Sequence, residues 1–185
     1  PEQSVHWKWC RDLIQSSQID RPRVLNLFGY SGIASLDAAI AGASVTHVDA
    51  SKKAINLAFE NRNRNNLETL PIRYLVEDAV SFVKKEINRE KKYDGIILDP
   101  PKYGRGPNGE IWKIEENLLD LMLLIKKILS ENPLFLVITS YAIRSSHMSL
   151  YNLLKSSLNF DYGKYSSGEL GIRESGKKRR VLSCA

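Results

Sequence analysis

Cysteine is scarce in this sequence of 185 residues, and long apolar runs are missing. Its two cysteines, Cys10 and Cys184, do not make a disulfide framework, which fits a reduced, cytoplasmic setting. No stretch approaches the roughly 20 apolar residues of a membrane-spanning helix, and no signal-peptide pattern is found. Three scattered histidines offer no metal-ligand spacing. We therefore expect neither a membrane span nor a metal site.

The remaining composition is that of an ordinary globular domain. Hydrophobic residues make up 43% and charged residues 26% of the chain, enough to build one core. The net charge of +6 favours an anionic partner such as RNA, although many basic enzymes bind no nucleic acid. The chain starts at Pro1 rather than Met and stops in a strand-like segment. We therefore expect further sequence beyond both ends.

Short apolar runs alternate with helical patterns along most of the chain. Strands are predicted at 23–28, 45–49, 72–76, 95–98 and 134–139, and helices at 33–41, 51–66, 80–87, 118–129 and 148–158. Such alternation produces a parallel sheet with helices on both faces. Residues 169–173 and 179–185 are strand-like and flank a turn, which predicts an antiparallel hairpin. The prediction is an α/β fold: a doubly wound, Rossmann-like, seven-stranded, mostly parallel sheet with an antiparallel C-terminal hairpin.

The first strand-to-helix turn, residues 26–32, contains Gly29 and Gly32 with Tyr30 and Ser31 between them. A doubly wound sheet binds its ligand beside this turn. The tight G-x-G of dinucleotide-binding proteins is absent, so the turn is poorly suited to a pyrophosphate. Asp49 closes the second strand, 20 residues after Gly29, where an acid can accept hydrogen bonds from ribose hydroxyls.

A further acid follows the third strand in Glu77-Asp78-Ala79. Asp78 can accept from an adenine amino group, or it can simply be the N-cap of the next helix. Each feature alone favours the ordinary structural explanation. Together, on successive strand ends, they favour a nucleoside cofactor without pyrophosphate, namely S-adenosylmethionine.

Four motifs carry a resemblance to a known family: residues 26–32 (NLFGYSG), 47–55 (HVDASKKAI), 77–79 (EDA) and 94–106 (DGIILDPPKYGRG). The sequence resembles the class I S-adenosylmethionine-dependent methyltransferases, and within them the ribosomal RNA large-subunit methyltransferase I/K-like family. The resemblance implies transfer of a methyl group to a base of 23S rRNA, with S-adenosylhomocysteine as product. It implies that residues 1–185 form one catalytic domain, with an upstream RNA-binding region outside this chain.

The resemblance also implies roles for individual residues. The residues expected to bind the cofactor are Gln3, Asn26, Phe28, Gly29, Tyr30, Ser31, Gly32, Asp49, Ala50, Ser51, Asp78 and Ala79. The expected catalytic motif is Asp99, Pro100, Pro101, Lys102 and Tyr103. Arg105 and Tyr141 are expected to contact the substrate.

The Asp-Pro-Pro sequence can create a rigid acceptor turn. Proline fixes φ and restricts the residue before it, so Asp99-Pro100-Pro101 stiffens the end of the fourth strand and leaves carbonyls free to accept hydrogen bonds. Tyr103 can stack on a flipped-out base. The alternatives are that the motif only ends a strand and that Tyr103 is an ordinary surface aromatic. Residues 104–109 are expected to form a flexible loop, either a lid or a plain connection.

No cysteine lies directly after the fourth or the fifth predicted strand, where related enzymes have a catalytic thiol. Because methylation of cytosine C5 needs a nucleophile to add at C6, the sequence favours a base nitrogen or another heteroatom as the target. Cys10 and Cys184 are expected to pack in the core. The basic run 177–180 is either a solvated hairpin tip or a phosphate contact. Two other functions stay open: a methyltransferase of a small molecule or protein, and a noncatalytic RNA-binding domain.

Overall fold

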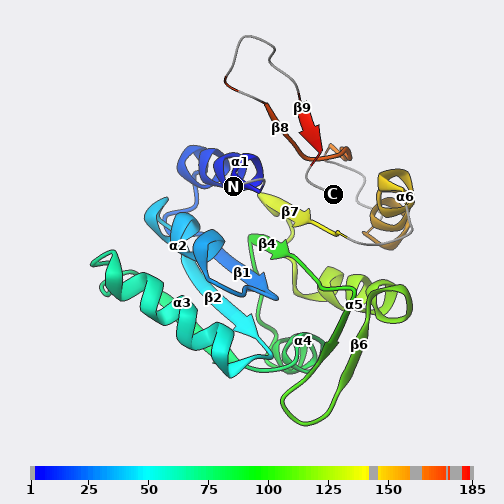
Figure 1. Ribbon diagram of the computed structural model, residues 1–185, viewed down its shortest axis with the longest axis horizontal. Coiled ribbons are helices and arrows are strands. Elements are labelled where there is room, and N and C mark those ends of the chain that lie inside the picture. Colours follow the sequence, from blue (N-terminus) through cyan, green and yellow to red (C-terminus); the bar gives the residue numbers. More distant parts are fainter. Residues whose placement is uncertain (1–2, 142–145, 159–163, 174, 176–180, 184–185) are drawn as a thin grey trace.

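The computed structural model describes residues 3–141, 146–158, 164–173, 175 and 181–183 (Figure 1). The helices are α1 (Ser4–Ser16), α2 (Ile33–Ile40), α3 (Lys52–Arg64), α4 (Ala79–Asn88), α5 (Ile114–Ile128) and α6 (His147–Leu158). The strands are β1 (Arg23–Leu27), β2 (Ser44–Asp49), β3 (Ile72–Val76), β4 (Gly95–Leu98), β5 (Tyr103–Arg105), β6 (Ile111–Lys113), β7 (Phe135–Ile138), β8 (Gly171–Arg173) and β9 (Val181–Ser183). Among these helices, none combines the length and the apolar character that crossing a membrane requires.

Five strands form one parallel sheet in the order β3-β2-β1-β4-β7. β1 lies in the middle and pairs with β2 on one side and β4 on the other. The chain first builds outward from β1 to β3 and then returns to add β4 and β7 on the opposite side. Parallel sheets bind ligands at the carboxyl ends of their strands beside such a reversal. The segments that follow β1, β2, β3 and β4 are therefore the place to look for a site.

Helices cover both faces of this sheet and create two apolar cores (Figure 1). Side chains of β1 alternate between them: Val24 packs in the core beside α1 and α2, whereas Leu25 and Leu27 pack in the core beside α4 and α5. All three are fully buried. Burial on both faces explains why this strand reads as a continuous apolar run rather than an alternating one.

The strands predicted for the parallel sheet are all present, and β3 and β4 have the predicted bounds. The predicted C-terminal hairpin is also confirmed, because β8 and β9 pair antiparallel. Within the described ranges, this hairpin is a two-stranded sheet of its own, so the main sheet contains five strands. Cys10 is 2% exposed in the core, as expected. Cys184 and the basic run 177–180 lie outside the described residues.

The segment after the Asp-Pro-Pro motif differs from the prediction. Residues 104–109 were expected to be a flexible loop, but β5 pairs antiparallel with β6 to form a hairpin. α5 follows it directly and starts at Ile114, four residues before the predicted start at 118. Each strand of this hairpin has only three residues, which is too short for an alternating pattern to stand out. We call this hairpin, residues 103–113, the ribbon.

Candidate functional site

The turn after β1 is held in an uncommon conformation. Phe28 and Tyr30 have φ angles of 58° and 44°, and Gly32 has 79°. Positive φ is rare outside glycine and persists only where the surroundings enforce it. A Cβ added at Gly29 would lie 2.3 Å from the ring of His47, so only glycine fits there. The sequence predicted that the backbone passes close to another group at this glycine. On the protein side, that group is the ring of His47.

A row of buried polar side chains supports this turn. Asn26 Nδ2 donates to Ser35 Oγ at 2.9 Å, and Ser35 Oγ lies 2.9 Å from His47 Nδ1. His47 is fully buried, which lowers its pKa to about 4 and keeps the ring neutral. Asn26, predicted to line the cofactor, is 2% exposed and directs its amide into this row. His47 and Ser35 were missed, because nothing in a sequence shows that two strands and a helix bring them together.

Asp49 connects the end of β2 to the glycine turn. Its Oδ2 accepts from the backbone N–H of Tyr30 at 3.0 Å, and its Oδ1 accepts from that of Ser51 at 2.8 Å. Ser51 also caps α3, accepting from Ala54 N at 3.3 Å. Asp49 at the end of β2 and Ala50 and Ser51 after it therefore lie next to the turn, and their contact with a cofactor stays a prediction. Two backbone donors fix the carboxylate, and each oxygen keeps a lone pair for a further donor.

Asn61, which was not predicted as a site residue, supports the same turn from α3. Its Nδ2 donates to the backbone carbonyl of Ser31 at 2.9 Å. On the other side of the turn, Tyr30 is 65% exposed. The predicted residues Ser31 and Tyr30 are thus part of one structured turn, with Ser31 tied to the protein and Tyr30 facing outward.

Asp78 follows β3 and is the N-cap of α4. Its Oδ1 accepts from Ser81 N at 2.8 Å, which confirms the capping interpretation. The side chain is 9% exposed, and Ala79 beside it is 4% exposed. Glu77 is directed elsewhere and forms an ion pair with Lys85. Contact of Asp78 with an adenine amino group stays a prediction, for which its second carboxylate oxygen is available.

Asp99, at the end of β4, is held by two side chains from distant parts of the chain. Gln3 Nε2 donates to its Oδ2 at 2.8 Å, and Thr139 Oγ1 donates to its Oδ1 at 2.6 Å. Gln3 was predicted to approach a cofactor, and the structure places its amide on Asp99. Thr139 was missed as a site residue. It follows β7, the strand beside β4, so the sheet register brings it to Asp99.

Two further side chains lie within electrostatic reach of Asp99. Burial lowers the pKa of His6, and the negative charge of Asp99 partly opposes that shift. Partial burial raises the pKa of Tyr141, and Asp99 raises it further. His6 Nδ1 is buried without a hydrogen-bond partner among the residues that the structure describes. Tyr141, a predicted substrate contact, is 52% exposed.

The two prolines after Asp99 differ in how their carbonyls are used. Trp112 Nε1 donates to the carbonyl of Pro101 at 2.7 Å, so this carbonyl is not free as predicted. The carbonyl of Lys102 accepts from Ile114 N at 3.0 Å. The carbonyl of Pro100 accepts from no donor in the described part of the chain. The turn therefore offers fewer free acceptors than expected: one proline carbonyl, that of Pro100, and the Asp99 carboxylate.

Trp112 connects the ribbon to the Asp99 turn and to the glycine turn. Its ring is 4% exposed and lies 4.9 Å from that of Phe28, measured between centroids. Phe28 thus lines the turn on the ribbon side. Lys102, Tyr103 and Arg105, predicted to act on the substrate, are exposed. Trp112 was missed because the sequence does not show which acceptor the N–H of a single tryptophan will find.

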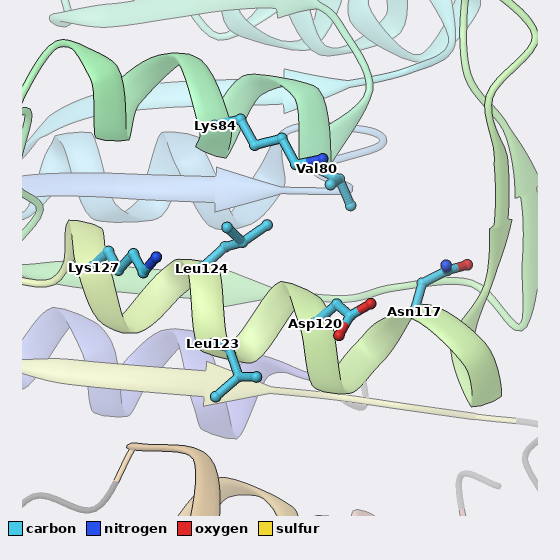
Figure 2. Close-up of a pocket in the computed structure, with 7 residues that line it drawn as sticks. All are labelled: Val80, Lys84, Asn117, Asp120, Leu123, Leu124 and Lys127. Atoms are coloured by element: carbon cyan, nitrogen blue, oxygen red, sulfur yellow. The ribbon is translucent and has the colours of Figure 1, made fainter.

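One pocket is lined by none of these residues (Figure 2). It has a volume of about 420 Å³ and is open to the surface between α4 and α5. Its lining residues are Val80, Lys84, Asn117, Asp120, Leu123, Leu124 and Lys127. None of them was predicted as a site residue, and the pocket brings together no pair of acids or nucleophiles. The chemistry-bearing side chains are gathered instead at the carboxyl ends of the strands.

Known proteins that are similar to this chain show which class of enzyme has this fold. The solved structure of the SAM-dependent methyltransferase from Agrobacterium tumefaciens is 47% identical to this chain, with a TM-score of 0.94, and the match covers 99% of this chain and 59% of that one. The chain therefore has the fold of a SAM-dependent methyltransferase. It belongs to the family described as "Conserved hypothetical protein 95", whose model matches residues 8–147.

Two curated relatives bear names that specify a substrate. The ribosomal RNA large subunit methyltransferase K/L of Shewanella frigidimarina is 37% identical over 111 residues, which is 59% of this chain and 15% of that protein. The ribosomal RNA large subunit methyltransferase I of Escherichia coli is 26% identical over 131 residues, which is 70% of this chain and 33% of that protein. The chain thus spans only part of the length of each relative it matches.

Proposed function

We propose that residues 1–185 form the catalytic domain of a methyltransferase that uses S-adenosylmethionine to methylate a base of large-subunit ribosomal RNA. The observation that carries the proposal is the link between the glycine turn and the acid of β2: Tyr30 N donates to Asp49 Oδ2 at 3.0 Å. This link joins the glycine-containing turn to a carboxylate at the reversal of strand order, which is where a nucleoside cofactor binds in such sheets.

The residues of the turn fit S-adenosylmethionine better than a dinucleotide. A Cβ at Gly29 would collide with the His47 ring, so the backbone of the turn packs closely against β2 and holds one shape beside Asp49. Asp49 keeps lone pairs for ribose hydroxyls while its orientation is fixed. No G-x-G is present to hold a pyrophosphate. When bound, the cofactor supplies an electrophilic methyl group on a sulfonium.

The turn at Asp99 supports a nitrogen of the base as the atom that receives the methyl group. The carboxylate of Asp99 and the free carbonyl of Pro100 are two acceptors on a rigid backbone. A pair of acceptors suits an N–H group, whose lone pair it can orient toward the methyl group. Cys10 offers no alternative, since it is buried and burial raises its pKa to about 12. A nitrogen of the base is therefore the target we propose, and Asp99 its orienting acceptor.

RNA as the substrate rests on two facts. The relatives that match this chain are named for ribosomal RNA. The chain has a net charge of +6, which suits a polyanion. A cytoplasmic location is part of the same proposal and rests on the scarcity of cysteine. The alternatives are a small molecule or protein as methyl acceptor, and a domain that binds RNA without transferring a methyl group.

Cofactor binding is tested by calorimetry of the purified chain with S-adenosylmethionine and with S-adenosylhomocysteine. We expect both to bind and Asp49→Ala to weaken both by about tenfold or more, because a ribose hydrogen bond to a charged acceptor is lost. Asp20→Ala is the matched control, since Asp20 is exposed and lies before β1. Equal affinities of the Asp49 variant and the parent would contradict the proposed cofactor site.

Methyl transfer is tested with labelled cofactor and large-subunit RNA lacking its modifications, followed by nucleoside mass spectrometry. We expect label in a nitrogen-methylated base and loss of transfer in Asp99→Ala with cofactor binding kept. Transfer to protein or to small molecules alone would favour the first alternative. RNA binding without any transfer would favour the second.

A further inference from the structure

The ribbon has two faces of different character. On one face Trp112 packs against Phe28 and bonds Pro101, and Gly104 lies opposite Trp112 on the paired strand. On the other face two cross-strand pairs face outward, Tyr103 with Lys113 and Arg105 with Ile111. Strand geometry produces this division, because successive side chains point to opposite sides. One face anchors the ribbon to the Asp99 turn, and the other is presented to solvent.

The outward face combines cations with flat or apolar side chains. Tyr103 is 51% exposed and Ile111 is 56% exposed. Lys113 forms an exposed ion pair with Glu116 at 2.8 Å. Arg105 and Lys102 make no ion pair with any residue that the structure describes. Arg105 on this face and Lys102 directly before the ribbon are therefore not held in ion pairs, and both lie within four residues of the prolines.

A hollow of about 140 Å³ opens at the base of the same face. It is lined by Lys102, Tyr103, Lys113, Ile114, Glu115 and Glu116. The phenol ring of Tyr103 is one wall, and carboxylates and ammonium groups provide both acceptors and donors. A flat, hydrogen-bonding ligand fits such a hollow better than an aliphatic one does.

We propose that the outward face of the ribbon is a docking platform for single-stranded RNA, which holds the nucleotides that flank the methylated base. Proteins that bind single strands combine a positively charged track with aromatic rings on which bases stack. Tyr103 supplies the ring, Arg105 and Lys102 contact phosphates, and the hollow receives one flanking base. The inference rests on the proposed function, which it deepens by assigning the RNA a surface.

The ribbon is ordered before RNA binds. Glu110 Oε2 accepts from Asn108 N at 2.9 Å, and Gly106 N donates to the carbonyl of Glu110 at 2.8 Å, which closes the tip. Trp112 fixes the base. A preorganised platform loses little entropy on binding, so a few contacts suffice. The ribbon therefore acts as a fixed part of the substrate site rather than as a lid.

The test compares two double variants of equal charge change. Arg105→Ala with Lys102→Ala removes the two proposed phosphate contacts, whereas Lys84→Ala with Lys127→Ala removes two cations from the walls of the pocket between α4 and α5 (Figure 2). Binding of a fluorescent single-stranded RNA is measured by anisotropy over a range of salt concentrations, and binding of S-adenosylhomocysteine by calorimetry. Tyr103→Ala is measured alongside them.

We expect the platform double variant to weaken RNA binding by roughly tenfold or more and to reduce the slope of log K against log salt by about one to two. Tyr103→Ala should weaken binding by about tenfold with the salt slope unchanged. The pocket variant should bind RNA as the parent does, and all variants should bind S-adenosylhomocysteine equally. That pattern supports the platform.

Two other results are distinguishable. Equal RNA affinities of the platform and pocket variants overturn the platform and leave the proposed function standing. If the parent binds S-adenosylhomocysteine but no RNA at any salt concentration, the platform is wrong, whereas the RNA substrate is judged separately by the methyl-transfer assay on large-subunit RNA. Binding of an acidic peptide that depends on Arg105 while RNA binding does not overturns RNA as the occupant.

Discussion

The side-chain amide of Gln3 donates to Asp99 Oδ2 across 2.8 Å, although 96 positions separate the two residues. Gln3 is the N-cap position of α1, and Asp99 directly follows β4. Thr139 donates to the other carboxylate oxygen. A carboxylate held by two donors keeps one orientation, and this orientation is what an acceptor needs to align an N–H group for displacement. The first helix is therefore part of the site and not only a cover for the sheet.

Replacement of Gln3 by alanine should slow methyl transfer by about tenfold while cofactor affinity stays near that of the parent. The reason is that the lost hydrogen bond goes to an ionised group, and such bonds are worth roughly 1.5–3 kcal/mol, of which a part is expressed in orientation. Single-turnover rates and calorimetry measure the two quantities. Gln15→Ala is the matched control, because Gln15 lies exposed on the same helix. A loss of cofactor affinity as large as the loss of rate would instead place Gln3 on the cofactor, as the resemblance implied.

Two substitutions of Thr139 distinguish the effect of its side-chain volume from the effect of its hydrogen bond to Asp99. Thr139→Val keeps the volume but removes the donor to Asp99 Oδ1, so we expect a rate about tenfold lower or more. Thr139→Ser keeps the hydroxyl and should restore most of the rate. Should the serine variant be as slow as the valine variant, the methyl group of Thr139 and not its hydroxyl would be what matters.

Much of the fold follows from the sequence, because the signals involved are local. The apolar runs of β3 and β4 are bounded by turn residues and have the predicted ends, and Ser51 caps α3 as its place before an apolar pattern indicates. The ribbon was missed for the opposite reason. Its strands have three residues each, and what stabilises them is the contact of Trp112 with Phe28 and Pro101, which are distant in sequence.

The sequence indicates which residues lie at the candidate site, but not which side chains contact them. Gly29, Asp49 and Asp99 are recognisable because each lies at or just after the end of an apolar run, and parallel strands bring their carboxyl ends to one edge. The partners of these residues are set by strand order, which a single sequence does not reveal. Thr139 reaches Asp99 only because β7 lies next to β4. His47 lies beneath Gly29 only because β2 lies next to β1.

Alanine at Gly29 should disrupt the cofactor site. Its Cβ would lie 2.3 Å from the His47 ring, so the turn or the ring must move. We expect a loss of stability of about 1–3 kcal/mol and a loss of cofactor affinity of tenfold or more. Denaturant unfolding and calorimetry measure these effects. Gly168→Ala is the control, since nothing lies within 4 Å of a Cβ there and that backbone needs no positive φ. If steric conflict is the cause, adding His47→Ala to Gly29→Ala should recover part of the cofactor affinity, and no recovery would refute this explanation.

His47 should make the stability of the domain depend on pH in a mildly acidic window. Burial lowers its pKa from 6.5 to about 4 in the folded state. Between these values the unfolded chain binds a proton at this residue and the folded chain does not, so stability increases with pH across the window. The stabilising contribution is complete above pH 6.5 and is lost as the pH falls toward 4, by about 3 kcal/mol in total. His47→Gln removes the titrating group, so unfolding free energies measured from pH 4 to 7 should vary less steeply in this variant than in the parent. His147→Gln is the control, because His147 lies at the exposed start of α6. An equally steep dependence in the His47 variant would show that other groups govern the acid sensitivity.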